Sequence, residues 1–432
     1  MALQSLRGTS DLLAGDVTRW SLIERTVRRL ATLYGYQEVR TPLMEDAAVF
    51  LRSVGETTDL VQKEMFRVQD RGGQDVVLRP EGTAPIVRAY LQHHLHKTQP
   101  FAKLFYLGPM FRAERPQAGR SRQFHQYGVE AIGSASPWVD VEVIVLCLDI
   151  LRACGVSRMD LWMTSMGCRK DQQRSAAQLR TRLSPQASRL CRDCQTRLKK
   201  NVFRVLDCKK PGCHTIAWAG GSASPFGLCA DCRAHFEAVR QGLREAGVAF
   251  DETRAFARGL DYYTRTVFEV RAAGLGAQDA VAAGGRYDHL VEEFGGPSVG
   301  AVGFAAGLER LLKAAEAGAP QQPAMSRRGI YLAVTEPSLL RDGFRLVQRL
   351  RSSGVTAHIG FDGKSLKAQL RLADRAGCRL VAILGATEQS QGTVTLKDLD
   401  AGGQETIGLD TFVETAQARS GSPCAHPRAR PS

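Results

Sequence analysis

The sequence predicts an α+β protein with a helical insertion and a separate C-terminal α/β domain. Two aromatic-rich stretches at 101–114 and 122–133, joined by the polar loop "RPQAGRS", indicate a long antiparallel hairpin. A basic, cysteine-bearing segment then interrupts an otherwise strand-rich region. After a Pro/Gln-rich linker, strand-like and helix-like stretches alternate, which is typical of a small α/β domain.

These changes in composition divide the chain. With 432 residues it is long enough for two or three domains. We expect a split first domain, an insertion, a linker, a second domain and a disordered tail. Their expected bounds are 1–167 with 249–318, then 168–248, 319–328, 329–419 and 420–432.

The elements of the first domain can be anticipated in order. Apolar residues at helical spacing predict a helix from Asp16 to Tyr34, and a second one covers 139–155. Short strand-like pieces, 65–70 and 75–80, lie between them, ahead of the hairpin. Strands resume at Phe250, and the glycine-rich stretch 298–307 leads from a last strand into a helix.

Charge and hydropathy indicate the kind of partner and exclude a membrane span. Lys and Arg number 58 against 44 Asp and Glu, for a net charge of +14. Between 168 and 210 there are 13 basic and 3 acidic residues, so this segment carries +10 of that charge. A polyanionic partner is expected. The sequence contains neither an apolar run of about 18 residues nor a signal-peptide pattern, which predicts a cytoplasmic location without membrane contact.

A nucleotide site would have to be built from side chains on a sheet, because the chain lacks the glycine-rich P-loop and dinucleotide patterns. Arg112 ends one hairpin strand, Glu114 follows on the same face, and Phe124 lies on the returning strand. An arginine can bind two phosphate oxygens, and a ring can stack on a base. The alternative is a surface ion pair beside a core phenylalanine.

The stretch "RGLDYYTRTVFEV", 258–270, is a strand with an unusual start. An arginine, a carboxylate and two phenols precede its apolar half, so we expect it to hold a polar ligand. "GGRYDHLV", 284–291, follows, and "GFAAGLERL", 303–311, joins a strand to a helix.

Together these stretches resemble a known family. Arg112 with Glu114, "GFAAGLERL" with Arg310, and the proline of "RTP" resemble the three signatures of class II aminoacyl-tRNA synthetases. "RGLDYYTRTVFE" and "GGRYDHLV" resemble the histidine-specific signatures of histidyl-tRNA synthetase. The resemblance implies a class II synthetase-like antiparallel sheet flanked by helices, a C-terminal anticodon-binding domain and a homodimer. It implies ATP- and Mg²⁺-dependent activation of L-histidine to histidyl-adenylate, then transfer to the 3′ end of tRNA(His).

Site residues are carried over from this resemblance. Arg258 is the expected catalytic cation that spans the substrate carboxylate and the α-phosphate. Arg112 joins it on the α-phosphate. The ATP-binding set is Arg112, Glu114, Phe124 and Arg310.

Histidine recognition needs buried groups that pair with both ring nitrogens. Glu130 and Tyr263 are expected in those roles. Tyr262 is expected on the same wall, and the equal alternative is that Tyr262 is an ordinary aromatic residue of the core. The expected acceptors of the substrate ammonium are Glu81, Thr83 and Gln126. Tyr287 resembles a residue of a substrate-side loop.

The cysteine spacing predicts zinc independently of the resemblance. Cys191-x2-Cys194 and Cys229-x2-Cys232 are the expected ligands, because two such pairs complete a tetrahedron. Cys208 and Cys213 lie between them and could displace one pair, and reduced structural thiols are the alternative. Deleting 168–248 is expected to weaken tRNA charging and to spare adenylate formation.

Two other functions fit parts of the sequence. A synthetase-like regulatory subunit of ATP phosphoribosyltransferase would share the core without charging tRNA. A non-catalytic nucleic-acid-binding protein would account for the charge and the cysteines but leave the arginines and carboxylates without a role.

Overall fold

The structure is a computed structural model, and it describes residues 3–54, 58, 60–114, 121–206, 208, 210–219, 226–252, 262–275, 279–318 and 327–420. The chain forms two compact units, Met1–Pro320 and Gln321–Ser432, which are treated separately below. Residues 319–326 of the expected linker and 421–432 of the expected tail lie outside the described residues. Within the described ranges, every helix is too short or too polar to cross a bilayer.

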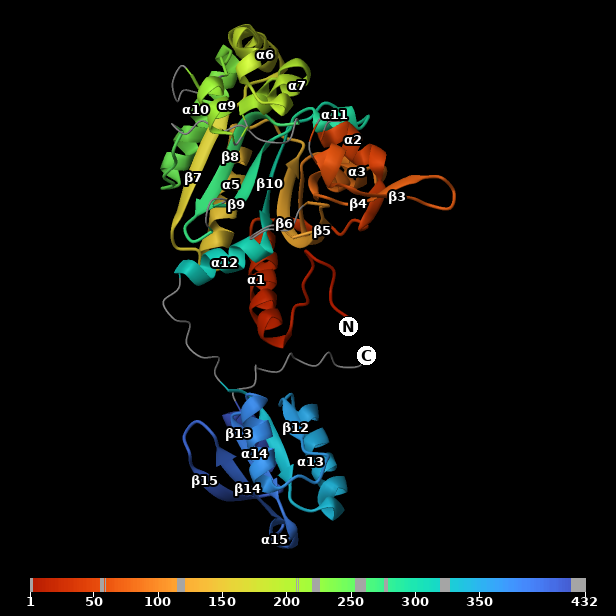
Figure 1. Ribbon diagram of the computed structural model, residues 1–432. Coiled ribbons are helices and arrows are strands. Elements are labelled where there is room, and N and C mark those ends of the chain that lie inside the picture. Colours follow the sequence, from red (N-terminus) through yellow and green to blue (C-terminus); the bar gives the residue numbers. More distant parts are fainter. Residues whose placement is uncertain are drawn as a thin grey trace. The chain divides into compact units, whose positions relative to one another are not determined.

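A seven-stranded sheet forms the centre of the first unit (Figure 1). Its neighbouring strands are antiparallel except for the parallel pair β1 and β5. The predicted hairpin is confirmed, because β5 and β6 pair along their whole length from Ala102 with Ile132 to Phe111 with Gln123. In spatial order the strands are β1 (Gln37–Glu38), β5 (Ala102–Phe111), β6 (Gln123–Ile132), β10 (Ala301–Gly307), β9 (Ala280–Arg286), β8 (Thr264–Ala272) and β7 (Met159–Ser165).

Four helices cover one face of this sheet. The predicted first helix is confirmed, and it buries Trp20, Ile23, Val27 and Leu30 at helical spacing. These side chains share one apolar core with the helix that begins at Pro137 and with alternate residues of β6. The four helices are α1 (Ala14–Leu33), α5 (Pro137–Ala153), α10 (Ala230–Glu245) and α12 (Leu308–Gly318).

A second apolar core lies on the opposite face of the sheet, around Phe50, Tyr90 and Met110. It packs short helices and a small three-stranded sheet against one end of the hairpin (Figure 1). The helices are α2 (Ala47–Val54), α3 (Thr83–Gln92), α4 (Leu95–Thr98) and α11 (Leu290–Glu293), with a π-helical turn at Leu60–Glu64. The small sheet has the order β2 (Met44–Asp46), β4 (Asp75–Leu78) and β3 (Phe66–Gln69).

The basic insertion is helical and has a small core of its own. Leu183, Val202 and Val205 are fully buried in that core, together with Cys194 and Cys213. Its elements are α6 (Arg169–Leu183), a 3-10 turn (Ser184–Arg189), α7 (Arg192–Lys200), α8 (Phe203–Leu206) and α9 (Pro211–Ala217). The following helix, α10, instead buries Val239 and Leu243 in the main core. The insertion is therefore attached firmly at its C-terminal end.

The second unit is a five-stranded mixed sheet with helices, as the alternation predicted. Apolar clusters on both sides of β11 show that the sheet is covered on both faces. Its strand order is β12 (Ala357–Ile359), β11 (Ile330–Val334), β13 (Leu380–Leu384), β14 (Thr393–Asp398) and β15 (Gln404–Gly408). Its helices are α13 (Leu340–Ser352), α14 (Leu366–Arg375), α15 (Ala386–Gln391) and α16 (Phe412–Arg419), with a 3-10 turn at Pro337–Leu339.

Candidate active site

The floor of the site is the uncovered part of the sheet beside the second core. Because side chains alternate along a strand, Phe124, Gln126 and Glu130 of β6 share this face, while Tyr127 and Val129 point into the main core. The neighbouring strand β10 places small residues opposite them: Gly303 pairs with Glu130, Ala305 with Gly128 and Gly307 with Gln126. These small residues leave open space above the sheet.

That space forms two cavities that share walls. The Glu130 cavity, which contains the Glu130 carboxylate, has a volume of about 410 Å³. The Arg310 cavity, which Arg310 lines, has a volume of about 500 Å³. Arg112, Glu114 and Gln126 line both. A ligand that extends from one cavity into the other would therefore pass Arg112.

All six residues expected to bind histidine line the Glu130 cavity. They come from the start of α3, from β6 and from the segment that precedes β8, which are far apart in the sequence. Tyr287, which follows β9, lines the same cavity. The six are Glu81, Thr83, Gln126, Glu130, Tyr262 and Tyr263.

Glu130 is the best-anchored carboxylate of this cavity. It is fully buried, and its Oε1 accepts a hydrogen bond from Thr83 Oγ1 at 2.7 Å. The Tyr287 hydroxyl donates to Oε2. Burial raises the pKa of Glu130 to about 8, and the hydrogen bonds from Tyr287 and Thr83 only partly offset this. The cavity thus contains a carboxyl group whose pKa lies near neutral pH.

Glu81, which is expected to bind the substrate ammonium, also has a structural role. Its two carboxylate oxygens accept the backbone N–H groups of Thr83 at 2.7 Å and of Ala84 at 2.9 Å, at the start of α3. This is a helix cap of the kind expected for an ordinary turn. Each oxygen keeps a second lone pair, and burial raises the pKa of Glu81. The cap therefore fixes the carboxylate in the cavity wall without exhausting its acceptors.

Three buried tyrosines also line this cavity, and one of them, Tyr287, contacts the Glu130 carboxylate. The Tyr262 ring lies 4.9 Å from that of Tyr263 and 5.8 Å from that of Tyr287, measured between centroids. Arg286 fixes the start of the Tyr287 segment through ion pairs of 2.7 Å with Asp140 and 2.8 Å with Asp288. In the sequence, Tyr287 stands out only as a member of "GGRYD". Its contact with Glu130 depends on how β6, β9 and β10 meet in the sheet.

The four residues expected to bind ATP line the Arg310 cavity, and its volume could hold a nucleotide base and ribose. The Arg112 guanidinium lies 5.1 Å from the centroid of the Phe124 ring, and its Nε donates to the Pro80 carbonyl at 3.0 Å. Arg112 thus covers one face of Phe124. A base stacked on Phe124 would use the other face, or Arg112 would turn toward phosphate. The four are Arg112, Glu114, Phe124 and Arg310.

Arg258, the expected catalytic cation, lies outside the described residues, as does the rest of 253–261. The described chain resumes at Tyr262, in the wall of the Glu130 cavity. Beyond it, β8 carries a bulge in which Arg265 has a φ of 45°, a strained value for a residue with a side chain. Because of the bulge, the pairing register between β8 and β9 shifts between Thr264 and Val267.

Arg204 is a charged cavity residue that the sequence analysis missed, as is Glu64. Arg204, on α8 of the insertion, is buried and lines the Glu130 cavity. Its only signal in the sequence is membership of a basic segment with twelve other cations. Because the insertion supplies part of the cavity wall, we no longer expect its deletion to spare adenylate formation.

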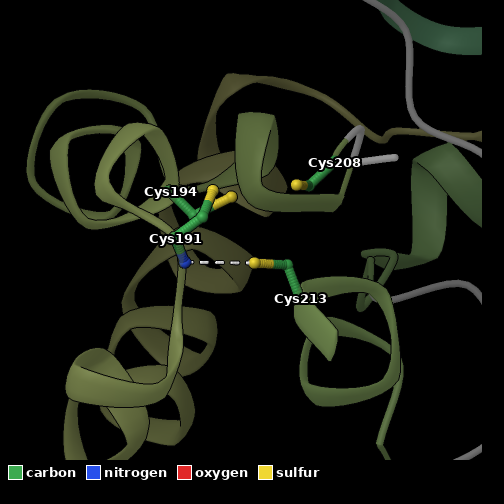
Figure 2. A group of neighbouring side chains, drawn as sticks. All are labelled: Cys191, Cys194, Cys208 and Cys213. Atoms are coloured by element: carbon green, nitrogen blue, oxygen red, sulfur yellow. Dashed lines mark hydrogen bonds between the residues drawn. The ribbon is translucent and has the colours of Figure 1, made fainter. Parts of the chain in front are cut away.

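The four expected zinc ligands do not come together as one set, which corrects that prediction; the grouping matches the alternative in which Cys208 and Cys213 displace one pair. Cys191 and Cys194 lie at the start of α7 and meet Cys208 and Cys213 from the segments around α8 and α9 (Figure 2). These four, the Cys191 cluster, place their sulfur atoms within 4.8 Å of one another, and the Cys191 amide donates to Cys213 Sγ at 3.2 Å.

The other predicted pair caps a different helix, and this separates the two pairs. Cys229 and Cys232 lie at the start of α10, which packs in the main core, and their neighbours are Cys168 and Asp171. The ligand atoms of this Asp171 cluster also lie within 4.8 Å of one another. Equal spacing within the pairs gave no information on which partner each pair would meet.

Comparison with known proteins agrees with this site. Residues 8–202 and 222–311 match the family model described as "Histidyl-tRNA synthetase", and residues 330–419 match that of an "Anticodon binding domain". The chain belongs to the histidyl-tRNA synthetase family. Synthetases of this family are aminoacyl-tRNA ligases that bind histidine and tRNA and use ATP and Mg²⁺.

Individual relatives cover almost the entire chain. The histidine–tRNA ligase of Desulfitobacterium hafniense is 43% identical over 97% of this chain and 99% of its own length. The histidine–tRNA ligase of Desulforudis audaxviator is 45% identical over 96% of this chain and 98% of its own length. The crystal structure of apo histidyl-tRNA synthetase from S. aureus superposes with a TM-score of 0.79 at 31% identity, covering 96% of this chain and all of that one.

The regulatory-subunit alternative finds less support. A Bacillus halodurans structure titled as an ATP phosphoribosyltransferase regulatory subunit/histidyl-tRNA synthetase is 21% identical, with a TM-score of 0.63, which shows a shared fold alone. The relatives that are 42% to 45% identical carry the ligase name.

Proposed function

We propose that the two joined cavities activate L-histidine with ATP and that the protein transfers the histidyl group to the 3′ end of tRNA(His). The observation that carries this proposal is the position of Arg112. It lies on the shared wall between a cavity lined by carboxylates and tyrosines and a cavity lined by Phe124 and Arg310. An amino acid and ATP placed in these cavities would meet beside this cation.

In this proposal Glu130 and Tyr263 recognise the imidazole ring. The ionised Glu130 carboxylate would accept from one ring N–H, and the Tyr263 hydroxyl would donate to the other nitrogen. Thr83 and Tyr287 support this role, because their hydrogen bonds hold both oxygens of Glu130 in place. A side chain without two ring nitrogens would leave these buried groups unpaired.

Binding of the amino group fits the other acidic residue of the cavity. The Glu81 carboxylate, held by the N–H groups of Thr83 and Ala84, would accept from the substrate ammonium with Thr83 and Gln126. Gln126 Oε1 is buried and makes no hydrogen bond within the described part of the chain, so an acceptor is available there.

The chemical step joins the two cavities. A carboxylate oxygen of histidine would attack the α-phosphorus of ATP, forming a P–O bond, while the bond to the bridging oxygen of pyrophosphate breaks. Arg112 and Arg258 would stabilise the negative charge that builds up on the α-phosphate. Phe124 would stack on adenine, and Arg310 would clamp the base or the γ-phosphate.

Magnesium fits the carboxylates between the cavities. Glu114 lines both cavities and Glu64 lines the Glu130 cavity, and carboxylate oxygens are the ligands that Mg²⁺ prefers. A bound Mg²⁺ would offset the charge of the pyrophosphate leaving group.

We assign tRNA to the basic insertion and to the second unit. We propose 1–167 with 249–318 as the catalytic core, 168–248 as an insertion that approaches the acceptor arm, and 329–419 as the anticodon-binding domain. The charge of +10 between 168 and 210 supports contact with phosphates.

We also propose a homodimer in the cytoplasm. Exposed apolar side chains along the N-terminal segment and α1, including Leu3, Leu13 and Leu22, fit a covered surface. Free thiols at all ten described cysteines fit a reducing compartment. Light scattering of the purified protein should give the mass of two chains.

We assign a structural zinc ion to the Cys191 cluster. Four cysteine sulfurs within 4.8 Å of one another match the ligand number and type of a closed zinc site. The ion would tie α7 to the segments around α8 and α9, and so hold Arg204 at the cavity.

Pyrophosphate exchange tests the proposed reaction. Wild-type protein with Mg²⁺ should incorporate labelled pyrophosphate into ATP with histidine and with no other amino acid. Arg112→Ala and Arg258→Ala should lose most of this exchange, whereas Arg152→Ala, at an exposed pair on α5, should retain it. A folded wild type without exchange would instead favour the regulatory-subunit alternative.

A further inference from the structure

The Asp171 cluster is a second group of metal-binding side chains, separate from the Cys191 cluster. Cys168, Asp171, Cys229 and Cys232 each offer one ligand atom, and the four atoms lie within 4.8 Å of one another. Three sulfurs and one carboxylate oxygen are a ligand set that suits tetrahedral Zn²⁺. We propose that the Asp171 cluster binds a second zinc ion.

The chain builds this cluster from two helix starts. Cys168 is the N-cap of α6 and Asp171 lies one turn later; Cys229 is the N-cap of α10 and Cys232 lies one turn later. Both pairs therefore have the x2 spacing that directs two ligands toward one ion. The starts of α6 and α10 meet, at the end of the first unit where the insertion lies (Figure 1).

Burial makes an uncompensated anion costly at this place. Asp171 is fully buried and Cys232 is 1% exposed. Asp171 forms an ion pair of 2.7 Å with Arg174, whose side chain is half exposed and also donates to the Gly227 carbonyl. Cys168 and Cys229 are partly exposed, so the four ligand atoms are gathered at a half-buried place that suits a bound cation.

Backbone N–H groups donate hydrogen bonds to the ligand atoms, as is common around metal sites. The Cys168 amide donates to Cys232 Sγ at 3.2 Å, and the Cys229 amide donates to Asp171 Oδ1 at 3.0 Å. The Cys191 cluster has the same feature, an amide 3.2 Å from a sulfur of a distant cysteine. Such contacts outside the ligand set fix the direction of the ligand atoms.

The backbone also leaves room for the Asp171 side chain. Gly167 has a φ of +70°, and a Cβ at this position would lie 2.5 Å from the Cβ of Asp171. A larger residue would therefore displace the carboxylate from the cluster.

The second ion would support the wall of the Glu130 cavity. The amide of Met166 donates to the Arg265 carbonyl, and the amide of Arg265 donates to the Gly167 carbonyl, both at 2.8 Å. On α6, Gln172 Nε2 donates to the Tyr263 carbonyl at 2.8 Å. The cluster thus fixes the start of α6, which in turn holds the backbone of Tyr263. This consequence rests on the proposed function, whereas zinc binding does not.

Metal content of the full-length protein tests the proposal. Protein purified under reducing conditions and dialysed against a moderate chelator should contain two zinc ions per chain by mass spectrometry. Asp171→Asn should retain one, because it removes the charged ligand with little change in shape. Asp171→Cys should retain two, and Cys208→Ser should lose the other ion. One ion in the wild type, or no change in Asp171→Asn, would overturn the proposal.

Cobalt substitution keeps the test decisive if Asp171→Asn folds poorly. Thiolate-to-cobalt charge-transfer absorption rises with the number of bound sulfurs, which is seven for the wild type and eight for Asp171→Cys by this assignment. Equal absorption at equal cobalt content would overturn it.

Asp171→Asn should also raise the KM for histidine several-fold in pyrophosphate exchange and leave the KM for ATP unchanged. Wild type with two zinc ions but no exchange would reject the proposed function alone.

Discussion

Glu130→Gln offers a quantitative test of the buried carboxyl group in the cavity. In the folded protein burial raises the pKa of Glu130 from 4.5 to about 8. The folded state therefore keeps a proton that the unfolded state has lost between these two pH values. Stability falls as pH rises through this window, by about 1.4 kcal/mol per pH unit and on the order of 5 kcal/mol in total.

Glutamine keeps the shape and can still pair with Thr83 and Tyr287, but it does not titrate. The unfolding midpoint of the wild type without histidine should therefore fall relative to Glu130→Gln between pH 5 and 8.5, on the order of 5–10 °C. Scanning calorimetry measures this difference, and Glu245→Gln, at an exposed position on α10, is the matched control. Parallel midpoint curves for the wild type and Glu130→Gln would refute the assignment of a proton to buried Glu130.

Three further substitutions test neighbouring parts of the account. Gly303→Ala would place a Cβ 2.0 Å from Glu130 Oε2, so the KM for histidine should rise at least about tenfold; an unchanged KM would contradict the placement of histidine here. Arg286→Met removes the arginine partner of fully buried Asp140 and should lower the free energy of unfolding by about 3–5 kcal/mol in denaturant titrations, whereas a loss below about 1 kcal/mol would show that His235, at 3.3 Å, compensates Asp140. Arg310→Ala should raise the KM for ATP about tenfold or more and leave that for histidine nearly constant; equal changes in both would place Arg310 outside the nucleotide site.

The sequence predicted those parts of the site that depend on strand periodicity. Phe124, Gln126 and Glu130 share a face because every second residue of β6 points the same way, and the hairpin fixes Arg112 near Phe124. The small residues of β10 were visible as "GFAAG", but their role as cavity floor required the register that sets Gly303 beside Glu130.

Contacts between distant segments could not be predicted. The hydrogen bond from Tyr287 to Glu130 depends on how β6, β9 and β10 align, and no local pattern records it. Arg204 looks like any cation of a basic segment, and only the packing of α8 brings it to the cavity.

The cysteine pairs illustrate the same limit. Their spacing predicted that each pair acts as a two-ligand unit, and in the structure each pair lies at the start of a helix, Cys191 at α7 and Cys229 at α10. Which units meet is decided by whether a helix packs in the insertion core or in the main core, and spacing within a pair does not encode this. Asp171 gave no signal because a carboxylate beside a single cysteine is common in any sequence.

The most direct test of the central claim is a crystal structure with a non-reactive sulfamoyl analogue of histidyl-adenylate. We expect the imidazole to lie between Glu130 and Tyr263, the sulfamoyl group beside Arg112 and Arg258, and the adenine on Phe124. Analogue bound outside the two joined cavities, or with its imidazole away from Glu130, would contradict this claim.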